Sequence, residues 1–257
     1  MSDKLSNFVW NGDNDGLKNA LKGGVDPNQR SYGEETALHC AAERDQAEAI
    51  KILIEAGADP NLTSERGDTP LIVGVIHKKP DAVAALLAGG ADPEIPNKIG
   101  ATPLNYVVRM NAGGGVTMTK TIVEDGVEKT VEVDMSPQER AAEEVARKLA
   151  AGGANPDAPD SDGCTALMRA AMATNLTYAQ ILIDAGAKAA FVDGYGFCAL
   201  HFAAVNESLE LATLLMEHGA DPSVKAKEAW QGVEAQQSPL DVAVAKGNAA
   251  IVTALGG

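Results

Sequence analysis

The sequence predicts an all-α solenoid, in which short helix–turn–helix units stack in a row and are joined by hairpin loops. Two observations carry this prediction, a repeated pattern and a particular composition. The chain of 257 residues repeats one pattern at a constant period, as repeat arrays do. Apolar residues make up 45% of the chain and aromatic residues only 4%, a composition that suits closely packed short helices.

Two independent landmarks carry the period. The first is a T-x-L element or its variant, which begins at Thr36, Thr69, Thr102, Thr165, Cys198 and Ser238, at intervals of 33, 33, 63, 33 and 40. The second is a small pair that begins at Gly24, Gly57, Gly90, Gly153, Gly186 and Gly219, at intervals of 33, 33, 63, 33 and 33. Both landmarks give a period of 33 and show the same interval of 63, so one unit holds 30 extra residues.

Each unit carries the signals of two helices. The Thr of the first landmark is a good N-cap, and Pro70, Pro103 and Pro239 follow such a residue at the first helical position. The second helix has apolar residues at helical spacing and stops at a Gly, such as Gly57, which can adopt the left-handed capping conformation. An Asp-Pro turn follows. Helices this short are marginal alone, so each unit must bury its face on the next.

Two complete units read TALHCAAERDQAEAIKILIEAGADPN and CALHFAAVNESLELATLLMEHGADPS. They resemble the ankyrin repeat, whose hallmark is T-P-L-H-x-A-A followed by L-L-x-x-G-A-D. The resemblance covers nearly the whole chain and implies a single ankyrin-repeat domain, 1–257, that forms a curved solenoid. We expect an N-terminal cap at 3–30, repeats at 31–63, 64–96, 97–159, 160–192 and 193–225, and a C-terminal cap at 226–257.

The extra residues of the fourth unit, about 111–137, fall between its two helices and predict a β-hairpin. The run is rich in Thr and Val, with Asp125-Gly126 near its middle, which is a strong hairpin signal. A two-residue turn pairs Glu124 with Val127 and Ile122 with Lys129. The predicted apolar face consists of Met118, Ile122, Val127, Val131 and Val133. Because an isolated hairpin is marginal in water, this face packs either on the solenoid or on a partner.

The last unit holds seven further residues, within KEAWQGVEAQQ, which enlarge its hairpin loop. Trp230 lies in this loop. It is interpreted either as a binding anchor at a loop tip or as a cover for the end of the stack.

Composition excludes several functions. A formal net charge of −15, with no basic stripe, argues against binding to nucleic acid or to an anionic membrane. The three cysteines show no CxxC pairing and indicate reduced thiols in a cytoplasmic or nuclear protein. His39 and His201 occupy the structural His of the repeat motif, and no second ligand shares their spacing. We therefore expect no catalytic residues, metal, cofactor or small-molecule ligand.

By resemblance to ankyrin repeats, a protein partner contacts the hairpin tips and the exposed side of the first helices, along a concave groove. The candidate contact residues are Tyr32, Arg66, Ile76, Ile99, Met110, Met172, Tyr195, Phe197, Val205 and Trp230, with Ile122 and Val131 of the insert. We expect a non-catalytic adaptor, scaffold or subunit of a larger assembly. The alternative is an inhibitor or regulator that occludes a single enzyme or cytoskeletal factor, since the stretch NGDNDGLKNAL is similar to the cap of such proteins.

Overall fold

The computed structural model of the chain describes residues 4–111, 119–124, 127–132 and 137–257, and of the residues between 112 and 136 it describes the backbone of the two strands alone. The described helices form pairs, one pair within each of the predicted units. The first helices are α1 (Lys4–Asn11), α3 (Ala37–Glu43), α5 (Pro70–Ile76), α7 (Pro103–Asn111), α9 (Ala166–Met172), α11 (Ala199–Val205) and α13 (Pro239–Lys246). The second helices are α2 (Asn14–Lys22), α4 (Ala47–Glu55), α6 (Pro80–Ala88), α8 (Pro137–Ala151), α10 (Leu176–Asp184), α12 (Leu209–Glu217) and α14 (Ala249–Ala254).

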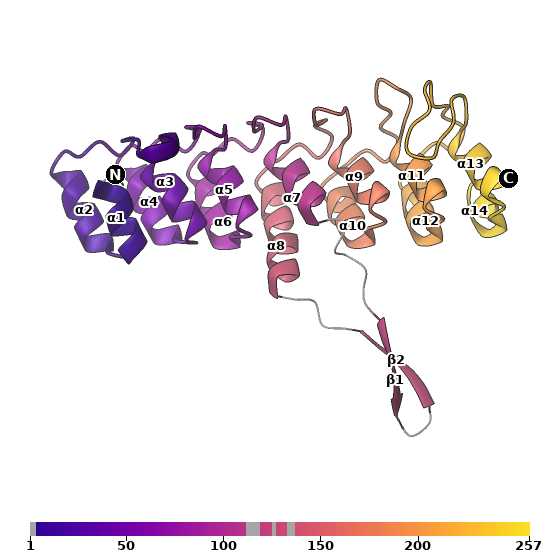
Figure 1. Cartoon of the computed structure of the whole chain (residues 1–257), viewed down its shortest axis with the longest axis horizontal. Helices are drawn as coiled ribbons and strands as arrows, with labels where there is room; N and C mark the ends of the chain where they lie inside the picture. The colour runs from indigo at the N-terminus through magenta and orange to yellow at the C-terminus, as the bar shows by residue number, and fades with distance from the viewer. Residues whose placement is uncertain (1–3, 112–118, 125–126, 133–136) are drawn as a thin grey trace.

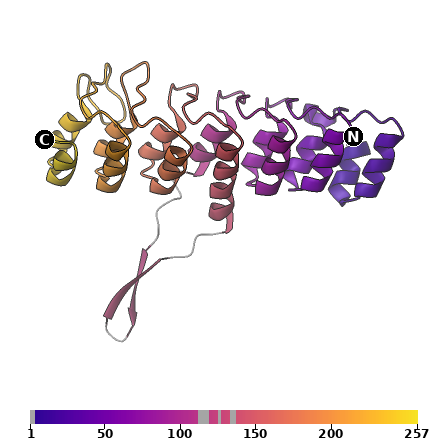
Figure 2. The same ribbon diagram turned by 180° about the vertical axis from the view of Figure 1, so that it is seen from behind.

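The pairs stand side by side in one row, with the two chain ends at opposite ends of it (Figure 1). First helices pack on first helices, as α3 on α5 and α11 on α13, and second helices pack on second helices, as α4 on α6. The loops that join successive units lie along one edge of the row, as Figure 2 also shows. The core is a continuous apolar layer between neighbouring units, which is how a solenoid buries faces that no unit could bury alone.

The helix ends follow the expected cap chemistry. The hydroxyls of Thr69 and Thr165 accept from the amides of Ile72 and Met168, each at 3.3 Å. At the other end of the units, Gly57 has a φ of 92°, in the left-handed region that a residue with a side chain avoids. These caps confirm that the Thr and Gly landmarks mark helix boundaries.

An Asn in the Asp-Pro-Asn turn ties one unit to the next. The side chain of Asn28 donates to the carbonyl of Gly57 at 3.2 Å and accepts from the amide of Asp59 at 2.7 Å. The side chain of Asn61 makes the same two bonds one period later, to Gly90 and Asp92. The turn residues therefore fix the spacing between units through backbone groups.

His39 is a structural bridge of the same kind. Its Nδ1 lies 3.1 Å from the amide of Thr36, and its Nε2 lies 3.0 Å from the carbonyl oxygen of Asp68 in the next unit. Because an amide only donates, Nδ1 must accept, and the proton sits on Nε2 and is donated to Asp68. Burial lowers the pKa of His39 to about 4. The structural role expected for this histidine is confirmed.

His201 repeats the arrangement behind a weaker cap. Its Nδ1 lies 3.2 Å from both the amide and the sulfur of Cys198, and its Nε2 lies 3.2 Å from the carbonyl of Gln237. The histidine therefore still satisfies the amide of the cap residue where the sequence has Cys in place of Thr. Because cysteine is a weaker N-cap than threonine, we expect this cap to stabilise its helix by about 0.5–2 kcal/mol less than a threonine cap.

The insert forms two strands, β1 (Thr119–Glu124) and β2 (Val127–Glu132), which pair antiparallel. Glu124 lies opposite Val127 and Ile122 opposite Lys129, the register that the Asp-Gly spacing predicts. The strands lie off the edge of the row opposite the loops (Figures 1 and 2). The predicted turn Asp125-Gly126 and the ends of the predicted apolar face, Met118 and Val133, lie outside the described residues.

Candidate protein-binding surface

Exposed side chains form a line along the C-terminal turns of the first helices. In each unit the residue of this line lies at one of two adjacent positions of the repeat. We call Trp10, Arg44, Ile76, Met110 and Met172 the first-helix row. Trp10 is 54% exposed, Ile76 37% and Met110 63%, whereas Met172 is half-buried. Large apolar side chains in a contiguous exposed line are typical of protein interfaces.

Trp10 is a member of this row that the sequence analysis missed. It lies exactly two periods before Ile76, so the repeat register alone could have found it. The guanidinium carbon of Arg44 lies 3.9 Å from the centre of the Trp10 ring, a cation–π contact between the first two units. The row therefore begins at the N-terminal cap.

Toward the C-terminus, the last loop covers the position that follows the first-helix row. Val205, the candidate one period after Met172, is half-buried. A Cβ built on Gly232, in the last loop, would lie 3.1 Å from Cγ1 of Val205, so that loop already covers this side chain. Val205 is thus a poorer contact candidate than the sequence indicates, because the enlarged last loop folds over it.

The loop tips add a second set of exposed side chains. Tyr32, in a short 3-10 turn (Tyr32–Glu34), is 90% exposed, and Arg66, Ile99 and Tyr195 are exposed as well. Neighbouring tips are bonded through their backbones. The amide of Glu65 donates to the carbonyl of Gly33 at 2.7 Å, and that of Lys227 donates to the carbonyl of Tyr195 at 2.8 Å. Backbone bonds therefore connect the first two of these tips, and the tip of Tyr195 with the last loop.

Phe197, expected at a tip, is instead a core residue, and that prediction is wrong. It is 2% exposed. Its ring stacks on Phe202, with centroids 6.1 Å apart, and meets the edge of Trp230 at 5.5 Å. The physical reason is the left-handed turn at Gly196, with a φ of 87°, which directs the chain inward after the exposed Tyr195.

Trp230 covers the end of the aromatic cluster. Its ring meets that of Phe202 at 5.7 Å with an angle of 90°, and the residue is half-buried. Of the two interpretations of this side chain, its contacts favour the cover. The last two candidates, Ile122 and Val131, lie in β1 and β2, but their side chains are outside the described residues, so their role stays a prediction.

Acidic groups gather between the tips and the first helices of the second and third units. Partial burial raises the pKa of Glu35, and the neighbouring charges of Glu43 and Asp68 raise it further, while Arg66 lowers it. Partial burial likewise raises the pKa of Asp68. A cationic group from a partner would therefore be favoured beside these carboxylates.

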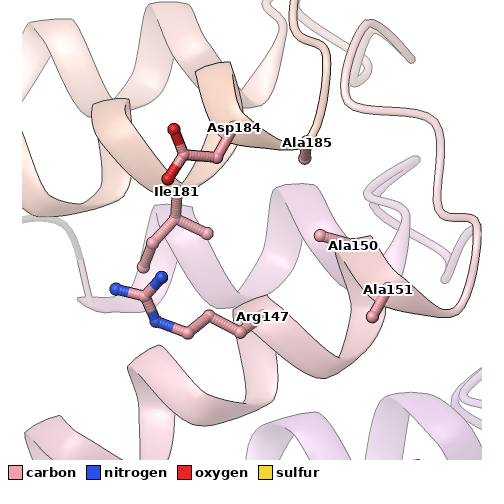
Figure 3. A pocket seen from close by; sticks show the side chains of 6 residues that line it. All are labelled: Arg147, Ala150, Ala151, Ile181, Asp184 and Ala185. Atoms are coloured by element: carbon pink, nitrogen blue, oxygen red, sulfur yellow. The ribbon is translucent and has the colours of Figure 1, made fainter.

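A hollow of about 320 Å³ lies on the other side of the row, between α8 and α10 (Figure 3). It is lined by Arg147, Ala150, Ala151, Ile181, Asp184 and Ala185. One interface earlier, Leu87 packs directly over Gly152, where an added Cβ would lie 2.6 Å from Cδ1 of the leucine. At the α8–α10 interface the corresponding residues are Ala150 and Ala185, so no large side chain fills the space.

We expect the double change Ala150→Leu with Ala185→Gly to restore the packing of the earlier interface. The added leucine, half-buried as Leu87 is, should raise the free energy of unfolding by about 1 kcal/mol. Ala150→Leu alone should gain less, since the Cβ of Ala185 occupies the place where Gly152 leaves room. Urea unfolding followed by circular dichroism measures both, and a double variant less stable than the native chain would contradict the packing argument.

Among the described residues, no group of three or more His, Cys, Asp and Glu side chains could hold a metal ion. In the same part of the chain, no helix is long and apolar enough to cross a membrane. The described surface carries exposed apolar side chains beside charged ones, such as Trp10 beside Arg44.

Comparisons with known proteins agree with the repeat architecture. A family model described as "Ankyrin repeats (3 copies)" matches residues 5–97 and 138–226, and the insert lies in the stretch between these two parts. The E3 ubiquitin-protein ligase KEG of Arabidopsis thaliana is 34% identical over 91 residues, which are 35% of this chain and 6% of that protein.

Two solved structures are similar over the whole length. The crystal structure of the ankyrin repeat domain of Bcl-3, described as a unique member of the IkappaB protein family, matches with a TM-score of 0.77 and 24% identity, over 100% of this chain and 99% of that one. The human ASB11 ankyrin repeat domain matches with a TM-score of 0.63 and 22% identity, over 99% and 96%. At these identities the likeness concerns the fold alone.

Proposed function

Since this chain belongs to the ankyrin repeat family, whose members are generally protein-interaction modules, we propose that it is a non-catalytic adaptor or complex subunit that binds one protein through its first-helix row and tips. The observation that carries the proposal is the line of exposed side chains from Trp10 to Met110, apolar except for Arg44, held in fixed spacing by the stack. Ankyrin solenoids offer such a surface as a long concave face.

The insert is a second candidate contact. Its two strands lie off the edge of the row, where an unpaired strand edge or an apolar hairpin face can receive a partner (Figure 1). We propose that it acts as a docking arm in addition to the row. The alternative, that the hairpin packs on the solenoid, predicts that its removal changes stability but not binding.

Further properties follow as proposals from charge and thiol chemistry. A net charge of −15 favours a partner with basic groups and disfavours nucleic acid and anionic membranes. The three cysteines are thiols that form no disulfide, and burial raises the pKa of Cys164 and of Cys198 to about 11. Reduced, inert thiols suit the cytoplasm or the nucleus. The ligase activity of the plant relative belongs to that protein, of which 6% is matched.

The test is capture of the partner from the native cell by matched variants. Ile76→Glu with Met110→Glu places charges on the first-helix row, whereas Leu176→Glu with Leu209→Glu places them on exposed leucines at the start of α10 and α12. We expect the first pair to weaken capture by about 2 kcal/mol or more, roughly thirtyfold in affinity, and the second pair to leave it unchanged.

A third variant replaces residues 112–136 by a short Gly-Ser linker. Loss of the partner from this variant, with the helicity unchanged, identifies the insert as a docking arm. Retained capture assigns recognition to the row. Loss of the partner only in the variant Leu176→Glu with Leu209→Glu would contradict the proposed surface. If capture of one enzyme also lowers its activity in a direct assay, the regulator alternative holds in place of the scaffold.

A further inference from the structure

Three successive loop tips are built on the same side-chain oxygen. Asn97, Asp160 and Asp193 occupy equivalent positions, and one oxygen of each accepts from the amides two and four residues later. For Asp160 these bonds are 3.0 and 3.1 Å long, to Asp162 and Cys164. For Asp193 both are 2.8 Å, to Tyr195 and Phe197. The two hydrogen bonds to this oxygen fix the conformation of the tip. The second polar atom at the end of the side chain remains available to another group.

The second atom is satisfied in the first two tips. The side-chain amide of Asn97 donates to the carboxylate of Asp68 in the preceding unit. Oδ2 of Asp160 receives the guanidinium of Arg169, with Nε at 2.8 Å and Nη2 at 2.7 Å. The same guanidinium also reaches Asp162. At this tip, the carboxylates of Asp160 and Asp162 therefore both bind the guanidinium of Arg169.

The third tip keeps the first carboxylate, as Asp193, but has Tyr195 where the second tip has Asp162 and lacks the arginine. Residue 202, one period after Arg169, is Phe202. Asp193 is 8% exposed, and within the described part of the chain its Oδ2 has no hydrogen-bond partner. A buried carboxylate oxygen without a partner is costly and rare in native proteins, so it calls for an explanation.

The neighbouring groups do not supply the missing cation. Cys164, Cys198 and His201 lie within electrostatic range of Asp193. Burial raises the pKa of the two thiols and lowers the pKa of the imidazole, so all three are neutral near pH 7. The ammonium group of Lys227 bonds to the carbonyl of Gly194 at 3.0 Å instead.

We propose that Asp193, together with the aromatic rings of Tyr195 and Trp230, receives an arginine side chain of the protein partner. The guanidinium binds Oδ2 of Asp193 as that of Arg169 binds Oδ2 of Asp160. Arginine suits the site because its planar fork binds carboxylates and stacks on aromatic rings, and because it is more weakly hydrated than lysine. An arginine at this site specifies the chemistry of the partner, and the assignment rests on the proposed protein-binding function.

Entry to the site requires the Trp230 ring to move. That ring packs on Phe197 and on Phe202, the residue one period after Arg169. It is half-buried and belongs to the loop that is seven residues longer than in other units. Trp230 therefore reports directly on occupation of the site, because displacement changes the environment of its indole.

The experiment uses the full chain carrying Trp10→Phe, which leaves Trp230 as its single tryptophan. Its fluorescence is titrated with N-acetyl-arginine amide and, separately, with N-acetyl-lysine amide at matched ionic strength. Asp193→Asn removes the charge and keeps the tip, since Asn97 accepts the same two amide bonds in an earlier tip. Asp162→Asn, which removes an exposed carboxylate one unit away, is the matched control.

We expect saturable arginine binding that is about tenfold weaker in Asp193→Asn and unchanged in Asp162→Asn. Asp193→Asn should also raise the melting temperature, because it removes an unpaired buried charge. Equal responses in the two variants, equal affinity for lysine, or no saturation would overturn the assignment. Those outcomes leave the first-helix row untouched, since its own charged variants test it separately.

Discussion

Replacing Phe197 with alanine should lower the free energy of unfolding by about 3–5 kcal/mol, the usual range for a large buried aromatic. The ring is 2% exposed and contacts Phe202, Trp230 and the imidazole of His201. Its removal leaves a cavity at the centre of this cluster, and the last loop loses the surface on which Trp230 rests. Chemical denaturation followed by circular dichroism measures the change.

The control is Tyr195→Ala, two residues away. Tyr195 is half exposed, and its amide and carbonyl, which bond to Asp193 and Lys227, are retained in alanine. Its stability should change by less than about 0.5 kcal/mol, as for most surface substitutions. If Phe197→Ala were equally harmless, the cluster would not be a core, and Phe197 would return to the list of contact residues.

His39 should make the stack sensitive to acid. Its pKa is about 4 in the folded chain against 6.5 for an ordinary histidine, so the folded state binds fewer protons between these values. The stability that depends on neutral His39 is complete above pH 6.5 and is lost as the pH falls from 6.5 toward 4. The lost part amounts to about 3 kcal/mol, since one pKa unit is worth about 1.4 kcal/mol.

The measurement compares the native chain with His39→Asn over this pH range. Asparagine is already present at the equivalent position of the fourth unit, as Asn105, so the variant should fold. The difference in unfolding free energy between the two proteins should shrink by about 3 kcal/mol from pH 7 to pH 4, because the other groups titrate alike in both. His77→Asn, at an exposed histidine, is the matched control. A constant difference for His39→Asn would mean that this histidine is not held neutral.

Much of the fold is predictable from the sequence because its signals are local and repeated. A cap such as Thr69 or Gly57 acts on its own turn of helix. Because the period is constant, the helix boundaries predicted in one unit can be compared with those in the other units. The pairing of Glu124 with Val127 follows in the same way from the two-residue turn between them. The surface that covers the hairpin's apolar face, on the solenoid or on a partner, has no such local signal, because it depends on residues far away in the sequence or in another chain.

The errors at the candidate site have the same physical origin. Phe197 is buried because Gly196 turns the chain inward and because Trp230, one period later in the chain, packs on it. The turn at Gly196 is local, but the contact with Trp230 has no local signal. Asp160 and Asp193 are the same residue at the same step of the repeat, yet only one is paired, because the difference lies nine residues on, at Arg169 and Phe202. The position of Trp10, by contrast, could be predicted from the sequence, because it lies two periods before Ile76.

The most direct measurement of the central claim is site-specific photo-crosslinking in the native cell. Benzoylphenylalanine is placed at Met110 on the first-helix row or, as a control, at Leu209 at the start of α12. If the row receives the partner, the probe at position 110 forms an adduct with one protein and the probe at position 209 does not. An adduct at position 209 alone, with none at position 110, would contradict the assignment of the binding surface to the first-helix row.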